Sequence, residues 1–183
     1  MNFNFLKILL PLFILSICII SCSEEDTTEP TEENLLLSTS FEENGVVSSE
    51  GWKLPVGSEF PMDAPPNGGI FSLKLQANSS LEYAYIKVAV KTQYKINKLT
   101  FWSKSTGVTS DIYGEAVLAL IRNGAELKSQ SIQIDEITWT SFSIRDTFDV
   151  APGDSFMVKF NGGIAQLLPA SAYFDLVQLQ GIE

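Results

Sequence analysis

The chain has 183 residues, with 12 Lys and Arg against 22 Asp and Glu, a formal net charge of −10, and no histidine. The lack of histidine excludes Ser-His-Asp and Cys-His catalytic units and histidine-ligated zinc or iron. The acidic balance excludes a typical nucleic-acid binder, because a phosphate backbone needs clustered Lys and Arg. With 45% hydrophobic and 19% charged residues, the composition is that of a folded protein.

The N-terminal segment has the pattern of an export signal. A single base, Lys7, precedes the apolar run Ile8–Ile20. A membrane-spanning helix needs about 20 apolar residues, so this shorter run predicts the hydrophobic part of a secretory signal. The run ends in Ile19-Ile20-Ser21-Cys22, which resembles the lipobox of bacterial lipoproteins. That resemblance implies lipidation of Cys22 and removal of residues 1–21; the alternative is a plain signal peptide with a chance cysteine.

Residues 22–34 contain six acids and no base. Like charges repel and nothing apolar can collapse, so this stretch predicts a flexible, extended tether. Acids directly after a lipidated cysteine resemble the signal that some Gram-negative bacteria use to place lipoproteins on the outer cell face. This resemblance implies an outer-membrane protein that contacts the membrane through its lipid anchor and faces the exterior.

Residues 35–183 suit one domain, and they alternate apolar and polar positions with no convincing helix. Asn123-Gly124 supplies the positive φ angles of a tight hairpin. No glycine-rich loop precedes a helix, so a nucleotide-binding fingerprint is absent from the sequence. The pattern predicts an all-β, two-sheet antiparallel β-sandwich or jelly roll. The expected strands are 35–41, 70–76, 81–90, 94–104, 112–121, 126–134, 138–144, 147–150, 155–161 and 171–179.

Five segments carry a further resemblance through their order and spacing. They are Ser40–Gly45 leading to Gly51-Trp52, Gly69–Leu75, Tyr94–Ser105, Trp139–Phe142 and Ala172–Leu179. Together they resemble the galactose-binding-like jelly roll, especially the carbohydrate-binding modules that accompany xylanases and glucanases. The resemblance spans residues 35–183 and implies a glycan-binding domain, although a shared fold does not by itself settle function.

The resembling modules carry a structural Ca²⁺ that ties the first strand to the last. The matching positions for its carboxylate ligands are Glu42 and Asp175, with backbone carbonyls around Ser72 and Lys74. Calcium favours such mixed carboxylate and carbonyl cages. The family often has a second Asp where this chain has Leu176. The alternative is an exposed Glu42 and an Asp175 that caps a strand end.

Aromatic residues are the candidates for contact with sugar. Exposed rings offer a flat apolar face to a pyranose, while nearby polar groups take its hydroxyls. Alternation places Tyr83 and Tyr85 together on one strand face, and Trp102 on the polar face of another strand. We predict that these three rings form one shallow glycan-binding face. The alternative, packing in the core or under loops, is the one we favour for Trp52 and Trp139.

We expect no enzyme. Glycoside hydrolysis needs two opposed carboxylates, one with a raised pKa, whereas the acid pairs Glu42-Glu43, Asp135-Glu136 and Asp146/Asp149 fall at turns or strand ends. The sequence therefore favours a lipid-anchored, non-catalytic envelope protein that binds glycan. The second hypothesis is a structural or adhesive accessory subunit whose sheet face contacts another protein.

Overall fold

The computed structural model describes residues 35–77, 80–107, 114–163 and 170–182. Cys22 and the 22–34 tether lie outside these ranges. No helix in the described ranges is long and apolar enough to cross a membrane. The described strands are β1 (Leu35–Thr39), β2 (Glu42–Glu43), β3 (Val46–Val47), β4 (Leu73–Gln76), β5 (Ala84–Ala89), β6 (Ile96–Thr106), β7 (Gly114–Arg122), β8 (Ala125–Ile134), β9 (Thr140–Asp146), β10 (Ser155–Asn161) and β11 (Ser171–Ile182).

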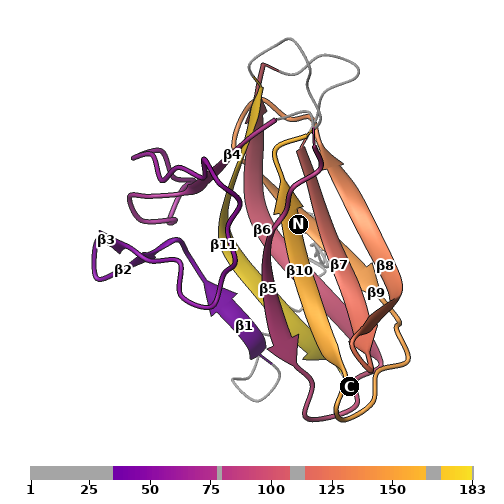
Figure 1. Ribbon diagram of the computed structural model, residues 1–183. Coiled ribbons are helices and arrows are strands. Elements are labelled where there is room, and N and C mark those ends of the chain that lie inside the picture. The colour runs from indigo at the N-terminus through magenta and orange to yellow at the C-terminus, as the bar shows by residue number, and fades with distance from the viewer. Residues whose placement is uncertain (1–34, 78–79, 108–113, 164–169, 183) are drawn as a thin grey trace, which may run out of the picture.

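The strands form two antiparallel layers (Figure 1). One sheet has five strands, in the order β1–β11–β6–β9 with β4 also paired to β11; we call it the β11 sheet. The other has four strands, in the order β5–β10–β7–β8, and we call it the β10 sheet. The short hairpin β2–β3 protrudes from the side of the sandwich on which β1 lies. The predicted two-sheet antiparallel β-sandwich is confirmed.

The core lies between the two sheets. Alternation along β10 buries Phe156, Val158 and Phe160 completely. Phe160 stacks on Phe174 of β11 across the layers, with ring centroids 4.3 Å apart and ring planes 9° from parallel. Complete burial of such a side chain contributes roughly 1.5–3 kcal/mol. The inward positions therefore hold the two layers together and leave the outward positions free for other roles.

The hairpin between β7 and β8 uses the Asn-Gly turn that the sequence indicates. Asn123 has φ 53° and Gly124 has φ 79°, and Arg122 pairs with Ala125 on either side of them. Two successive positive φ angles match the right-handed twist of the flanking strands. This turn sets the register of the two residue pairs next to it, and a bulge between Leu120 and Ile121 shifts the rest of the β7–β8 ladder by one residue.

One edge of β11 is shared by two strands. β4 pairs with residues 171–174 of β11, and β1 pairs with residues 177–180. Between these segments the ladder to β6 shifts register, and Leu176 takes a φ of 48°. This bulge places Asp175 where the two edge strands meet, opposite Trp102 of β6.

Two expectations about the strands are wrong in detail. Residues 147–150 form no strand, although Phe148 and Val150 are buried. Their apolar side chains pack into the core from an unpaired segment, and alternation alone does not distinguish that case from a strand. The residues after the expected strand 35–41, for which we predicted no strand, contain the hairpin β2–β3.

Candidate functional site

The outer face of the β10 sheet carries the predicted residues Tyr83 and Tyr85. Tyr85 lies on β5 beside Lys159 of β10 in the antiparallel register, and Val117 of β7 flanks Lys159 on the other side. Because Val158 and Phe160 point into the core, the alternate residue Lys159 points outward. The outer face at this row therefore combines an aromatic ring, an ammonium group and an apolar floor.

A hydrogen-bonded network fixes Tyr83 on this face. Its hydroxyl donates to Glu115 Oε2 at 3.0 Å, and Asn161 Nδ2 donates to the same oxygen at 3.1 Å. Lys159 Nζ lies 5.4 Å from the centroid of the Tyr83 ring and 2.8 Å from Glu126 Oε2. Burial and the bond to Glu115 raise the pKa of Tyr83 to about 12, so the phenol stays a neutral donor at any physiological pH.

A small cavity lies beside the two tyrosines. Its volume is about 210 Å³, and Tyr83, Tyr85, Lys53, Leu54, Pro55 and Glu82 line it. Lys53 holds Tyr85 in place through backbone pairing. The Lys53 N–H donates to the Tyr85 carbonyl at 2.8 Å, and the Tyr85 N–H donates to the Lys53 carbonyl at 2.9 Å. The ring of Tyr85 thus sits on a strand that is paired on both sides. This cavity offers aromatic, cationic and carboxylate groups within one recess.

The third predicted residue, Trp102, is not part of this face. It lies on β6, in the β11 sheet, and the buried residues Leu99 and Phe101 of that strand point into the core. Tyr85 and Trp102 therefore point outward from opposite layers of the sandwich. The prediction of a single face containing Tyr83, Tyr85 and Trp102 is wrong, because alternation fixes the side of a strand but not the sheet to which the strand belongs.

Trp139 takes part in a clamp on the outer face of the β11 sheet. Its indole N–H donates to Asp63 Oδ1 at 3.1 Å, and Lys104 Nζ lies 2.7 Å from Asp63 Oδ2. Lys104 also lies over the rings of Trp139 and Tyr173, 5.2 and 5.0 Å from their centroids. Burial opposes ionisation of Asp63, but the bonds from Lys104 and Trp139 outweigh it and lower its pKa. These contacts fasten the loop that carries Asp63 to the sheet.

The two carboxylates expected to bind calcium converge on the same glycine pair. A Cβ on Gly68 would lie 2.6 Å from Asp175 Oδ2, and a Cβ on Gly69, whose φ is 81°, would lie 2.0 Å from Glu42 Oε1. Glu42 Oε2 accepts the N–H of Phe71 at 3.0 Å. Only glycine leaves room for both carboxylates at this point, where the start of β2 meets the bulge of β11.

Asp175 is buried and incompletely satisfied. Its Oδ1 accepts N–H bonds from Leu176 at 2.8 Å and Phe41 at 3.4 Å, whereas its Oδ2 has no hydrogen-bond partner among the described residues. Burial is the main reason that its pKa rises to about 7, and the Glu42 charge adds to the rise. An unpaired, buried carboxylate oxygen beside a second carboxylate fits a cation that would neutralise both.

The rest of the implied calcium shell is less complete. The Lys74 carbonyl accepts the N–H of Glu59 at 3.1 Å, so that oxygen is already engaged in a bridge. Within the described ranges no group of three or more Asp, Glu, His or Cys is arranged to hold a metal. A metal here would depend on Glu42, Asp175 and backbone oxygens.

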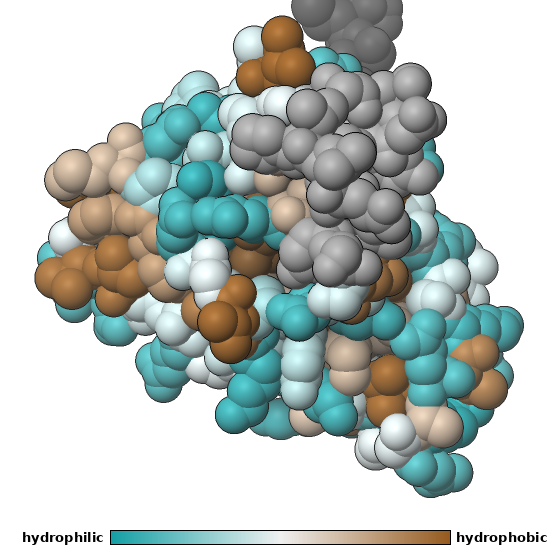
Figure 2. Space-filling model, turned by 45° about the horizontal axis from the view of Figure 1, so that its top comes forward, coloured by the Kyte–Doolittle hydropathy of each residue, from teal (hydrophilic) through white to brown (hydrophobic). Residues whose placement is uncertain are grey.

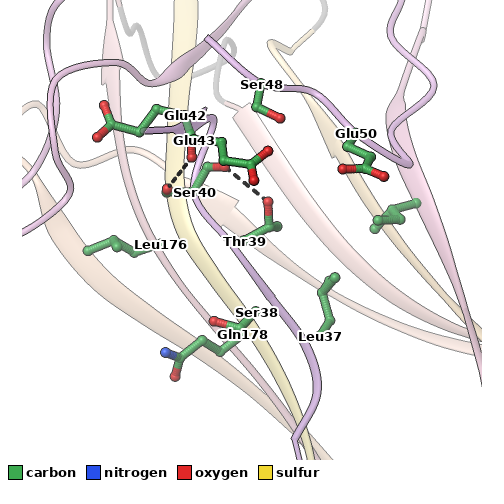
Figure 3. Close-up of a pocket in the computed structure, with 11 residues that line it drawn as sticks. Leu37, Ser38, Thr39, Ser40, Glu42, Glu43, Ser48, Glu50, Leu176 and Gln178 are labelled. Atoms are coloured by element: carbon green, nitrogen blue, oxygen red, sulfur yellow. Dashed lines mark hydrogen bonds between the residues drawn. The ribbon is translucent and has the colours of Figure 1, made fainter. Parts of the chain in front are cut away.

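A larger hollow lies next to this glycine pair, around β1 (Figure 3). Its volume is about 500 Å³. Figure 3 shows Leu176 and Gln178 of β11 on one side of β1 and Glu50 on the other. Its lining is rich in hydroxyl and carboxylate groups and consists of Leu37, Ser38, Thr39, Ser40, Glu42, Glu43, Ser48, Glu50, Ile86, Leu176 and Gln178. The hollow can accept hydrogen bonds from a polar ligand.

Exposed apolar side chains gather on the protruding side of the molecule that carries β2–β3 (Figure 2). Val46, Val47, Met62 and Ile70 are exposed in this region of the chain. Scattered surface apolar residues are common, and nothing in the structure identifies a partner for them.

Sequence reasoning missed the polar residues Glu115 and Lys159 that lie beside Tyr83 and Tyr85 on the outer face of the β10 sheet, which we call the tyrosine face. Alternation alone indicates that Glu115 and Lys159 point outward. It does not reveal that β10 lies between β5 and β7, which brings Glu115 to Tyr83 across 32 residues of sequence.

The fold is that of known carbohydrate-binding modules. The chain is similar to the CBM22-1 xylan-binding domain of Xyn10C from Paenibacillus barcinonensis, at 16% identity and a TM-score of 0.56, covering 82% of this chain and 96% of that one. It is also similar to a family 16 carbohydrate-binding module, at 20% identity and a TM-score of 0.50, covering 71% and 90%.

A third similar structure contains the CBM22-1 and GH10 modules of xylanase 10B from Clostridium thermocellum, complexed with xylohexaose. The identity is 14% and the TM-score 0.52, and the match covers 82% of this chain and 29% of that one. No protein-family profile matches the sequence, and no curated protein matches it. At these identities the likeness shows a shared β-sandwich fold.

Proposed function

We propose that this protein binds glycan on the outer face of the β10 sheet, at Tyr83 and Tyr85. The observation that carries the proposal is that both rings line one recess beside the Tyr83–Glu115–Asn161 network. The β-sandwich shared with xylan-binding and other carbohydrate-binding modules supports the same conclusion.

Each group has a distinct part in this proposal. The Tyr85 ring offers a stacking surface to the apolar face of a pyranose, worth about 1 kcal/mol on the scale of other ring contacts. Glu115 accepts hydrogen bonds from sugar hydroxyls and Lys159 donates them, while the buried Asn161 holds Glu115 in place. A few such contacts correspond to micromolar to millimolar affinity, roughly −8 to −4 kcal/mol.

The proposed role is binding and not hydrolysis. A general acid that cleaves a glycosidic bond needs a raised pKa. The hydrogen bond from Lys159 is the main reason that the pKa of Glu126 is lowered, which is the opposite of that requirement. Glu115 already accepts two hydrogen bonds from its neighbours. Glu115 and Glu126 are therefore suited to hold a sugar in place.

We further propose that the protein is anchored in the outer membrane through lipid on Cys22 and faces the exterior. The lipobox-like Ile19-Ile20-Ser21-Cys22 and the acidic residues after it support this proposal. Many anchored copies acting on one polysaccharide would bind it more strongly than a single copy, without any new contact.

Calcium is a further proposal. Glu42 and Asp175 would hold the ion, and the unpartnered Asp175 Oδ2 together with the Gly68-Gly69 pair supports this assignment. When bound, Ca²⁺ supplies positive charge and structural cohesion only. The chain's own contribution is to fasten the start of β2 to the bulge in β11.

The test of glycan binding is a calorimetric titration of the mature chain against neutral xylan, galactan and glucan oligosaccharides. Tyr85→Ala should weaken binding by about fivefold to tenfold. Tyr83→Phe, which removes only the hydroxyl donor, should weaken it less. Lys98→Gln, which changes a charge on the other sheet, should leave it unchanged. If the wild type binds no glycan, the protein-contact hypothesis replaces this proposal.

A further inference from the structure

The three tryptophans of the chain differ in what their rings contact. Trp52 is buried and stacks on Phe160, with ring centroids 5.4 Å apart. Trp139 donates its N–H to Asp63 and lies against Lys104. Trp102 is half-buried, and its side chain has no hydrogen bond, ring contact or cation–π contact with the described residues.

A tryptophan on a sheet face whose side chain makes no specific contact has two groups free to bind a ligand. An indole carries a large apolar face together with an N–H donor, and buried indoles normally find a partner for that donor. Trp139 has such a partner, whereas the indole N–H of Trp52 has none among the described residues and its ring is fixed in the core against Phe160. Trp102 leaves both its ring and its donor available, which is how a residue that contacts an external ligand is placed.

The side chains around Trp102 are uncharged and polar. Ser141 of β9 lies directly opposite it in the register, and the next row joins Ser143, Thr100 and Gln178 across β9, β6 and β11. Ser141 and Ser143 are exposed, since β9 is the last strand of its sheet. Hydroxyl and amide groups in this arrangement can both donate to and accept from sugar hydroxyls.

Asp175 lies opposite Trp102 in the register but is buried against Gly68, and the other charges nearest to this patch are either paired or distant. Lys104, two residues along β6, is held by Asp63. Lys98 and Arg145 lie two rows away in the other direction. The row through Gln178 continues to Ser38 of β1, and both residues line the hollow of about 500 Å³. A neutral, hydroxyl-rich ligand thus matches the patch, and the carboxylates of Glu42, Glu43 and Glu50 in its continuation disfavour an anionic one.

We propose that Trp102, with Ser141, Thr100 and Ser143, forms a second glycan-binding surface that takes a neutral pyranose chain. It lies on the opposite layer of the sandwich from Tyr83 and Tyr85, so one domain would hold two chains at once. The inference goes beyond the proposed function, because it assigns a separate site with its own ring. Its consequence is that the domain cross-links polysaccharide as well as binding it.

The experiment measures stoichiometry and cross-linking separately. Detergent-solubilised mature chain is titrated with xylohexaose and with a neutral galactan oligosaccharide, and its ability to make soluble xylan or galactan turbid is recorded. The wild type should bind two oligosaccharides and produce turbidity. Trp102→Ala should bind one and produce none. Tyr85→Ala should keep a residual site, which the double variant Tyr85→Ala/Trp102→Ala loses. Trp139→Phe serves as the control and should keep both sites.

The outcomes separate the two proposals. If Trp102→Ala keeps the wild-type stoichiometry and turbidity, the second surface is overturned while the tyrosine face stands. If Tyr85→Ala is unchanged and only Trp102→Ala loses binding, the tyrosine face falls and the Trp102 surface stands. Trp102→Phe, which keeps a ring, should restore the second site and so exclude loss of folding as the cause. If sedimentation shows that Trp102→Ala abolishes a dimer and glycan binding is unaffected, the patch is a contact between copies of the chain.

Discussion

Phe160 of β10 and Phe174 of β11 stack nearly parallel across the two sheets, with ring centroids 4.3 Å apart. Both side chains are completely buried. Phe174→Ala should therefore destabilise the fold by about 3–5 kcal/mol, because it removes buried apolar surface and leaves a cavity. Urea unfolding measures this loss. Leu127→Ala, at an exposed position of β8, is the control and should change stability by less than about 0.5 kcal/mol. A loss below about 1 kcal/mol for Phe174→Ala would contradict the described packing.

The proposed site at Glu42 and Asp175, beside Gly68-Gly69, predicts that calcium raises the stability of the fold. Saturating Ca²⁺ stabilises a folded protein by about 2.7 kcal/mol at one hundred times its dissociation constant, and a chelator should remove that gain. Thermal unfolding with Ca²⁺ and with chelator gives the difference. Asp175→Asn should abolish the response to calcium, whereas Asp135→Asn, an exposed substitution away from the site, should preserve it. Identical melting temperatures of the wild type under both conditions would show that calcium does not stabilise the fold.

Asp154 predicts a pH dependence of stability. Arg122 donates to both of its oxygens, at 2.9 and 2.8 Å, and Ala151 N–H donates at 2.8 Å. The bond from Arg122 is the main reason that the pKa of Asp154 falls from 3.8 to about 2. Because the pKa of Asp154 is lower in the folded protein than in the unfolded chain, its charge stabilises the fold at pH values above the unfolded pKa of about 4. This stabilisation is lost as the pH falls from about 4 to about 2.

The variant Asp154→Asn tests this dependence. It should be less stable than the wild type at pH 7, and the difference should shrink towards zero between pH 4 and pH 2. Guanidinium unfolding across that range measures it. A difference that stays constant with pH would show that the charge of Asp154 does not contribute in the described way.

Cys22 predicts membrane attachment. Labelling cells with a fatty-acid analogue should mark the wild type, and Cys22→Ser should lose the label and leave the membrane fraction. Cys18→Ser, within the apolar run, is the matched control and should keep both. Label retained by Cys22→Ser would place the anchor elsewhere.

The sequence predicts where the strands lie better than it predicts which strands pair with one another. The expected strand 155–161 matches β10, and the Asn123-Gly124 turn lies where the hairpin turns. In both places a local rule, side-chain alternation or backbone φ, decides the structure. The split of the β11 edge between β4 and β1 follows from pairing between distant segments, which no local rule fixes.

The candidate sites show the same limit. Alternation places Tyr85 and Trp102 outward on their strands, but sheet order sends them to opposite layers. The contact of Trp139 with Asp63 spans 76 residues and depends on a loop that lies across the sheet. Glu42 and Asp175 are far apart in the sequence and both meet the glycine pair, and their role as calcium ligands stays a prediction.

The division of the β11 edge has a mechanical consequence. A force on residue 35, where the predicted tether would join β1, acts first on the four residue pairs that join β1 to β11. β4 holds a separate stretch of β11, and β6 pairs along the opposite edge of that strand. β1 can therefore peel away under load while the rest of the two sheets stays closed on the core, so the tyrosine recess on the β10 sheet would keep its shape while the hollow around β1 is lost.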